Sequence, residues 1–168
     1  MFFLRDLPTE KMLRELAKRY PDLDPMALLT CTALLRTGSD VLAGFEKILA
    51  RHGLSQGGFL SLIVLNREPE EEITPSALAH KLGVTRATMT GLLDTLAKDD
   101  LVERVQHDGD RRSVVIRLTA KGRKRLDGIL PGYYRQITRM MAGVSQKERR
   151  SLIGLLEKVR LGLPALLD

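Results

Sequence analysis

The most regular pattern in the chain is a stripe of apolar residues that begins after Asp24-Pro25 and almost reaches Gly53. Asp at the N-cap followed by Pro at the first helical position is a strong helix start. The apolar residues then recur at alternating spacings of three and four: Leu28, Cys31, Leu35, Gly38, Leu42, Phe45 and Leu49. Such a stripe suits packing along another helix better than covering a small core. The sequence therefore predicts a long helix that needs a partner.

Shorter helices are predicted on both sides of this long helix. The segment that opens with Asp6-Leu7-Pro8-Thr9 and is stopped by Pro21 has apolar residues at helical spacing: Met12, Leu13, Leu16 and Ala17. After Gly53, Ser55 is expected to cap the next helix. The buried face of that helix would consist of Phe59, Leu62, Ile63 and Leu65.

The middle of the chain predicts two helices joined by a tight turn. Thr74-Pro75 starts the first helix, which ends at Gly83. Thr85 caps the second, whose apolar residues recur at helical spacing: Met89, Leu92, Leu93 and Leu96. Two short helices around a glycine turn fit a helix-turn-helix. Asp99-Asp100 should end the second helix, since Asp tolerates turn conformations well.

A β-hairpin is predicted directly after the second of these helices. Alternating residues from Val102 to His107 form one strand, and Ser113 to Leu118 form the other, with Val114, Ile116 and Leu118 expected on one face. Asp108-Gly109 between the strands is a strong hairpin turn signal. A helix-turn-helix followed by a hairpin is a winged helix.

Two more helices complete the predicted fold. Thr119 caps the first, which runs to about Met141 with a kink expected at Pro131. Ser145 and Glu148 form a capping box for the last helix, whose apolar residues are Leu152, Leu155, Leu156 and Val159. The expected fold is mainly α (α+β): N-terminal helices in 1–52, a winged helix-turn-helix in 53–118, and long C-terminal helices in 119–168.

Charge is distributed unevenly along the chain. The formal net charge is +6, and residues 81–125 hold 11 basic and 6 acidic residues, whereas residues 1–80 hold 9 and 11. A basic segment of this kind is a candidate surface for a polyanion, with a solvated charged face as the alternative. The cluster Lys121, Arg123, Lys124 and Arg125 is interpreted as such a solvated helix face.

Several classes of protein fit the sequence poorly. One cysteine cannot form an internal disulfide, and the apolar stretch from Met26 to Leu35 is too short to span a bilayer. We therefore expect a soluble, cytoplasmic protein. The three histidines lie in separate predicted elements, without the spacing of a metal site or of a catalytic motif. We expect no enzymatic activity, no metal and no cofactor.

The central fragments, taken in order, resemble the MarR family of bacterial transcription regulators. They are Leu82-Gly83-Val84-Thr85-Arg86-Ala87-Thr88-Met89-Thr90, Leu101-Val102-Glu103-Arg104, Asp108-Gly109-Asp110-Arg111-Arg112-Ser113 and Leu118-Thr119-Ala120-Lys121-Gly122. The resemblance covers roughly residues 25–165. It implies a homodimer held by interlocked terminal helices that binds palindromic double-stranded DNA, usually as a repressor released by a small ligand or by oxidation. A two-fold dimer should read an inverted repeat with half-sites about one helical turn apart.

Two groups of residues are expected to contact the DNA. Thr85 and Arg86 lie at the start of the second helix of the motif, where backbone amides favour phosphate, and Thr88 and Thr90 could reach base edges. The family often carries an arginine where this chain has Gly91, so one expected contact is missing. At the wing, the resemblance maps Arg112 onto a minor-groove reader held by Asp110, with Arg111 on phosphate, although the arginines could exchange roles.

The sequence says less about regulation. Cys31 lies where the organic-hydroperoxide branch of the family has its sensing cysteine, but the positions matching that branch's tyrosines are Leu35, Phe45 and Gln56. A redox-sensing repressor is therefore an alternative, next to Cys31 as a buried, unreactive part of the apolar stripe. Phe45, Phe59 and Met89 could line an effector pocket or simply belong to the core, and Arg36 and His52 could meet an acidic ligand. A sequence-independent architectural DNA-binding protein is the other alternative.

Overall fold

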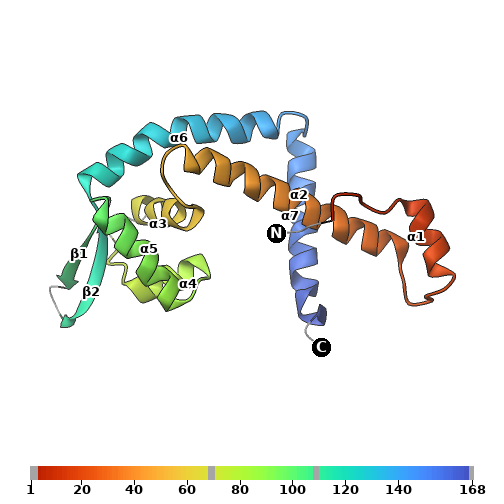
Figure 1. Ribbon diagram of the computed structural model, residues 1–168, viewed down its shortest axis with the longest axis horizontal. Helices are drawn as coiled ribbons and strands as arrows, with labels where there is room; N and C mark the ends of the chain where they lie inside the picture. The colour runs from red at the N-terminus through yellow and green to blue at the C-terminus, as the bar shows by residue number, and fades with distance from the viewer. Residues whose placement is uncertain (1–3, 68–70, 108–109, 167–168) are drawn as a thin grey trace. The chain divides into compact units, whose positions relative to one another are not determined.

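The computed structural model describes residues 4–67, 71–107 and 110–166, without the side chains of residues 107 and 110–113. The chain divides into two compact units, Met1–Arg123 and Lys124–Asp168, each of which is described by itself (Figure 1). The first unit holds the N-terminal helices and a winged helix, and the second holds most of the C-terminal helices.

Two helices open the first unit. α1 (Glu10–Ala17) is capped by Thr9, and α2 (Pro25–Ala50) by Asp24, whose carboxylate accepts hydrogen bonds from the amides of Met26 and Ala27. α1 packs against the first half of α2 (Figure 1) and buries Leu13. Met12 and Leu16, expected with Leu13 on one apolar face, are largely exposed. The predicted starts of both helices are thus confirmed.

The apolar stripe of α2 is largely exposed within the single chain. Leu35 and Leu42 are each about half exposed (48% and 47%), Cys31 is exposed, and Leu49 is the only stripe residue in the buried class. The expectation of a buried Cys31 is therefore wrong for the single chain. Leu49 is buried because α2 ends beside α3.

By length and composition alone, α2 could cross a membrane. The apolar stretch is therefore longer than the predicted Met26–Leu35, because apolar residues continue from Val41 to Ala50 after a short polar segment. An apolar helix that packs along another chain meets the same test of length and composition. α2 also carries the Arg36–Asp40 ion pair one turn apart, and charged side chains at membrane depth are costly.

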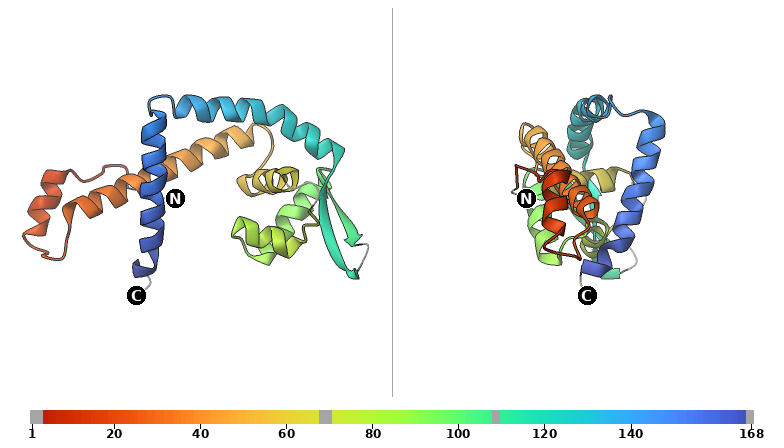
Figure 2. Two further views of the ribbon diagram at one scale, coloured as in Figure 1. Left: turned by 180° about the vertical axis from the view of Figure 1, so that it is seen from behind. Right: turned by 90° about the vertical axis from the view of Figure 1, so that its right-hand side faces the viewer.

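Three short helices form the centre of the winged helix: α3 (Gln56–Arg67), α4 (Pro75–Leu82) and α5 (Arg86–Lys98). They pack on one another beside the hairpin, as the views from the front and from behind agree (Figures 1 and 2). Their shared core includes Phe59, Leu62, Leu78, Met89 and Leu93, all at most 2% exposed. Phe59 and Met89 therefore belong to the core. Val64 is buried where Ile63 was expected, and Ile63 is half-buried.

The turns around α5 follow the sequence signals. Gly83 has φ of 65° and Asp100 has φ of 61°, both in the left-handed region. Glycine adopts this region without a steric penalty, and Asp is one of the few other residues found there. These two residues end α4 and follow α5, as the sequence predicted.

The hairpin consists of β1 (Val102–His107) and β2 (Asp110–Leu118), paired antiparallel with Val102 opposite Leu118 and an irregularity after Gln106. β2 thus starts three residues before the predicted Ser113. Val115 and Ile116 are both buried, whereas Val114 is 37% exposed. Val114, Ile116 and Leu118 alternate on one face as predicted, and Ile116 and Leu118 are buried. Val115, between them, is buried as well, because α3, α4 and the residues before α4 also pack on β2. The predicted turn, Asp108-Gly109, lies outside the described residues.

α6 (Ala120–Met140) starts at Thr119, whose hydroxyl accepts a hydrogen bond from the amide of Gly122, and continues through Pro131. α7 (Gln146–Gly162) and a 3-10 turn (Leu163–Leu166) follow in the second unit. The predicted capping box is present, and hydrogen bonds from the Ser145 hydroxyl and amide lower the pKa of Glu148. None of the residues described in α7 is buried, and Leu155, Ile153 and Leu161 are more than half exposed.

Candidate DNA interface

The start of α5 presents a polar, capped end to solvent. The Thr85 hydroxyl accepts a hydrogen bond from the amide of Thr88 at 3.1 Å, and the two threonine hydroxyls lie 2.9 Å apart. Thr85, Arg86 and Thr88 are all exposed, and the first turn contains no acidic residue. Free amides and the helix dipole make such an end attractive for phosphate.

The next turn of α5 exposes Ala87, Thr90 and Gly91. The Thr90 hydroxyl donates a hydrogen bond to the carbonyl of Arg86 at 3.0 Å, and the Thr95 hydroxyl donates to the carbonyl of Gly91 at 3.0 Å. The opposite side of the helix is occupied by the buried Met89, Leu93 and Leu96. The N-cap Thr85 and the three predicted contact residues on α5, Arg86, Thr88 and Thr90, are therefore exposed near the N-terminal end of the helix.

The hairpin is fixed to α5 by a pair of charged side chains. Nη2 of Arg104 on β1 lies 2.6 Å from Oδ1 of Asp94 on α5. At the base of the hairpin, the Thr119 hydroxyl donates to the carbonyl of Asp100 at 2.7 Å. Sequence reasoning missed the Asp94–Arg104 pair, because the two residues are ten positions apart in different elements and no periodicity connects them.

The segment before α4 joins the other side of the hairpin. The amide of Ile116 donates a hydrogen bond to the carbonyl of Ile73 at 2.8 Å, and the two residues form an antiparallel bridge. Next to this bridge, Glu72 lies 3.7 Å from Arg117 of β2, and Glu71 lies 3.1 Å from Lys81 of α4. These acidic residues thus contact both the wing and the helix-turn-helix.

The wing residues predicted to contact DNA lie at the outer end of the hairpin. Asp110, Arg111 and Arg112 form the first part of β2, and their side chains are not described. Their roles in DNA binding stay predictions.

Three of the candidate regulatory residues, Arg36, Phe45 and His52, have interactions within the chain. Arg36 pairs with Asp40 along α2, which supplies this arginine with a carboxylate of its own chain. Phe45 and His52 are half-buried, and both have interactions within the chain. Among the described residues, no group of three or more His, Cys, Asp or Glu side chains is placed to hold a metal ion.

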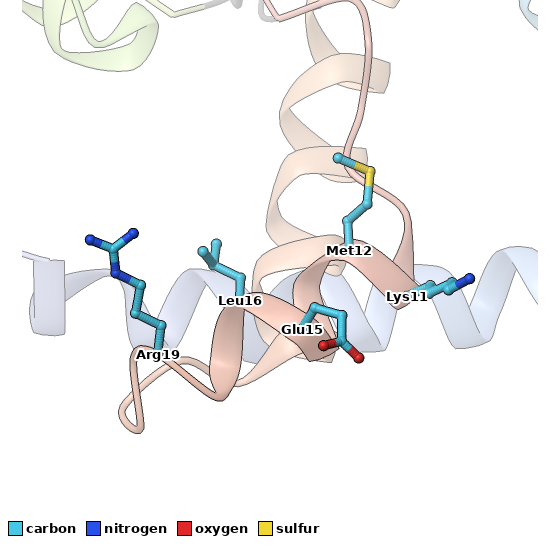
Figure 3. A pocket seen from close by; sticks show the side chains of 5 residues that line it. All are labelled: Lys11, Met12, Glu15, Leu16 and Arg19. Carbon is cyan, nitrogen blue, oxygen red and sulfur yellow. The ribbon is translucent and has the colours of Figure 1, made fainter.

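Figure 3 shows a groove of about 610 Å³ along α1, lined by Lys11, Met12, Glu15, Leu16 and Arg19. Met12 and Leu16 point to the same side, and the charged side chains flank them. Because all the lining residues come from one short segment, the groove is an open face and does not enclose a small molecule. A smaller pocket of about 100 Å³ lies beside β2, with Glu71, Glu103, Arg117 and Arg123 among its lining residues.

The sequence relationships of the chain agree with this geometry. A sequence model described as the MarR family matches residues 54–114. The chain is 35% identical to the HTH-type transcriptional repressor YetL of Bacillus subtilis over 153 residues, which cover 91% of this chain and 92% of YetL. The chain belongs to the MarR family. It is also 30% identical to the transcriptional repressor MprA of Escherichia coli K12, covering 90% of this chain and 86% of MprA.

Solved structures of MarR proteins share the fold. The DNA complex of Staphylococcus aureus MepR aligns over 79% of this chain and 95% of MepR with a TM-score of 0.71, at 18% identity. The DNA complex of MosR from Mycobacterium tuberculosis aligns over 78% and 96%, with a TM-score of 0.59 and 28% identity. CouR from Rhodococcus jostii RHA1, bound to p-coumaroyl-CoA, aligns over 77% and 90%, with a TM-score of 0.66 and 26% identity.

These comparisons confirm the predicted mainly helical winged-helix fold and the MarR family membership. The protein is a DNA-binding transcription regulator. YetL and MprA are both named as repressors of transcription rather than as enzymes.

Proposed function

We propose that this MarR protein is a repressor that binds a palindromic operator as a homodimer and is released by a small-molecule effector. The observation that carries the DNA-binding part is the exposed outer face of α5, next to a wing that is held by the Asp94–Arg104 pair and the Ile73–Ile116 bridge. In this proposal α5 enters the major groove. Thr85 and Arg86 contact phosphate, and Thr88 and Thr90 contact base edges.

The wing contributes the second contact. Arg111 and Arg112 reach the backbone and the adjacent minor groove, and Asp110 orients the arginine that enters the groove. Support comes from their position at the outer end of a hairpin whose base is tied to α5. A narrow minor groove attracts guanidinium groups through its negative potential.

The homodimer is supported by apolar surface that the single chain leaves exposed. Apart from the buried Leu49, the α2 stripe is half-buried or exposed, and none of the residues described in α7 is buried. Exposed apolar surface of this extent usually marks a protein interface. A second copy supplies a matching surface, since a two-fold dimer uses the same patch on both chains. Residues 1–52 and 119–168 are then the dimerisation parts, and 53–118 the DNA-binding part.

The repressor role is supported by YetL and MprA, which are both named as repressors. The effector is supported by CouR, whose structure holds p-coumaroyl-CoA. Neither the open groove along α1 nor the pocket of about 100 Å³ beside β2 encloses a ligand of the size of p-coumaroyl-CoA, so the effector is proposed without a site. A DNA-binding regulator of bacterial genes works in the cytoplasm, which is the location we propose.

The experiment titrates the purified protein onto DNA from upstream of its own gene, with a scrambled duplex of equal length beside it, at about 150 mM salt. A preference of about a hundredfold, which corresponds to about 3 kcal/mol, supports a specific regulator. Equal binding to both duplexes, followed by failure to select any preferred sequence from genomic DNA, would favour the architectural alternative. Sedimentation of the free protein and of the complex gives the number of chains bound, and two chains on one inverted repeat are expected.

Redox release is a separate outcome of the same assay. The Cys31 thiol is exposed on α2. If organic hydroperoxide abolishes binding of the wild type and not of Cys31→Ser, the regulator senses oxidation instead of a ligand.

A further inference from the structure

The exposed strip in the middle of α5 is poor in hydrogen-bond donors. Ala87, Thr90, Gly91 and Asp94 follow one another at spacings of three, one and three, so they share one helix face, and all four are exposed. Thr90 uses its hydroxyl hydrogen in the bond to the carbonyl of Arg86. Asp94 is an acceptor that already pairs with Arg104. The strip therefore offers methyl groups and acceptors to whatever lies against it.

Base edges in the major groove differ in what they require from a protein. Guanine presents two acceptors, O6 and N7, so its selection needs a donor. Thymine presents a methyl group, which apolar atoms can recognise. The side chains of this strip offer the Ala87 and Thr90 methyl groups and no donor, so the strip fits thymine better than guanine. The nearest donor is the exposed Arg86 side chain, one turn before Thr90, which contacts phosphate in our proposal.

Gly91 adds a second observation. A Cβ at this position would meet no atom within 4 Å, so packing within the chain does not require glycine here. Glycine in a helix interior is unfavourable compared with alanine. Its advantage at this position is that the helix backbone can approach the base edges closely, which brings the neighbouring Thr90 methyl group within contact distance.

We propose that Thr90, beside the flat surface of Gly91, selects a thymine in each operator half-site through its methyl group. This inference rests on the proposed entry of α5 into the major groove. It makes Thr90 a specificity-determining residue, and it assigns the selection to the methyl group instead of the hydroxyl.

The test replaces, one position at a time, each thymine of the selected operator by deoxyuridine, which lacks only the 5-methyl group. For the wild type we expect one symmetric position at which the loss is about fourfold per half-site, the factor that burial of one methyl group supports. Thr90→Ser removes the protein methyl group and should bind thymine and deoxyuridine operators equally. Thr90→Val keeps the methyl group without the hydroxyl and should retain the discrimination.

Thr138→Ser is the matched control, because Thr138 is exposed and its hydroxyl makes the same bond, to the carbonyl of Tyr134 at 2.9 Å. It should leave the discrimination unchanged. Gly91→Arg introduces a donor and should shift the selected base toward guanine. Specific binding by a wild type that is insensitive to deoxyuridine, or by a Thr90→Ser variant that still discriminates, overturns this inference and leaves the proposed regulator intact. Loss of all sequence preference in the wild type overturns both.

Discussion

Nη2 of Arg104 on the wing lies 2.6 Å from Oδ1 of Asp94 on α5. The side chains are 44% and 59% exposed, so water screens their attraction, and exposed pairs of this kind contribute at most about 1 kcal/mol to stability. The pair joins the two elements that contact DNA in our proposal. Its main effect is therefore on the position of the wing beside α5.

Arg104→Gln should accordingly weaken operator binding by up to about fivefold, the factor that corresponds to about 1 kcal/mol, while changing the free energy of unfolding by less than about 1 kcal/mol. Arg14→Gln is the control, since Arg14 forms an exposed pair with Glu10 on α1. It should leave operator affinity unchanged at equal salt. Equal affinities for wild type and Arg104→Gln would show that the pair does not position the wing.

Arg112→Ala should weaken operator binding by about 1–3 kcal/mol without unfolding the protein. The reason is the loss of a guanidinium group from the minor groove. Arg123→Ala removes the same charge from an exposed position on α6 and should cost much less. The measurement is a salt titration of binding for both variants. Wild-type affinity for Arg112→Ala would remove the wing from the mechanism.

Leu42→Ala should weaken dimer formation, whereas Leu62→Ala should lower the stability of the fold. Leu42 is 47% exposed in the single chain, whereas Leu62 on α3 is fully buried. Leu42→Ala should raise the dimer dissociation constant, measured by sedimentation equilibrium. Leu62→Ala should lower the free energy of unfolding by about 2–5 kcal/mol through the cavity that it leaves. A Leu42→Ala dimer as tight as the wild type would contradict the proposed use of the α2 stripe.

Gly122→Ala and Gly128→Ala should have opposite effects on the same helix. A Cβ at Gly122 would collide with the carbonyl oxygen of Leu101 and the side chain of Leu118, whereas at Gly128 it would meet nothing within 4 Å. We expect Gly122→Ala to destabilise the protein by about 1–3 kcal/mol. Gly128→Ala should stabilise it by up to about 1 kcal/mol, because alanine is the better helix former. Thermal unfolding of both variants, followed by circular dichroism, is the check.

The capping box of α7 should give stability that depends on pH. The Ser145 hydroxyl first, and then its amide, lower the pKa of Glu148 below the ordinary value of 4.5. A carboxyl group whose pKa is lower in the folded state stabilises it above the unfolded pKa, and this contribution is lost as the pH falls through the folded pKa.

Urea unfolding of the wild type and Glu148→Gln should therefore differ by a constant amount at neutral pH. The difference should shrink at pH values below 4.5. Ser145→Ala should remove most of the same pH-dependent part, since it deletes the larger of the two causes. A difference that does not change with pH would contradict this account of Glu148.

Local signals predicted most of the fold. Asp24-Pro25, Thr85, Gly83 and Ser145 act through hydrogen bonds or dihedral angles within a few residues, so the chain itself contains the information. The exposure of Cys31 and of Met12 could not be predicted, because an apolar spacing shows that a face needs a partner but not where that partner comes from.

The part of the candidate interface that depends on local signals could also be predicted from the sequence. The helical pattern and the N-cap Thr85 place Arg86 and Thr90 on α5. By contrast, the Asp94–Arg104 pair and the Ile73–Ile116 bridge depend on tertiary packing between separate elements. No spacing rule applies to such contacts, so neither could be read from the sequence.

The bridge between Ile73 and Ile116 also affects how the wing behaves in solution. An isolated two-stranded hairpin offers unpaired amides and carbonyls along both outer edges, and these can recruit strands from other molecules. In this protein, the Ile116 amide on one edge is already bonded to the carbonyl of Ile73. A substitution that frees the segment around Ile73 would uncover this edge. The uncovered edges of separate molecules could then pair with one another, and the resulting aggregates would lower the amount of protein that can bind DNA.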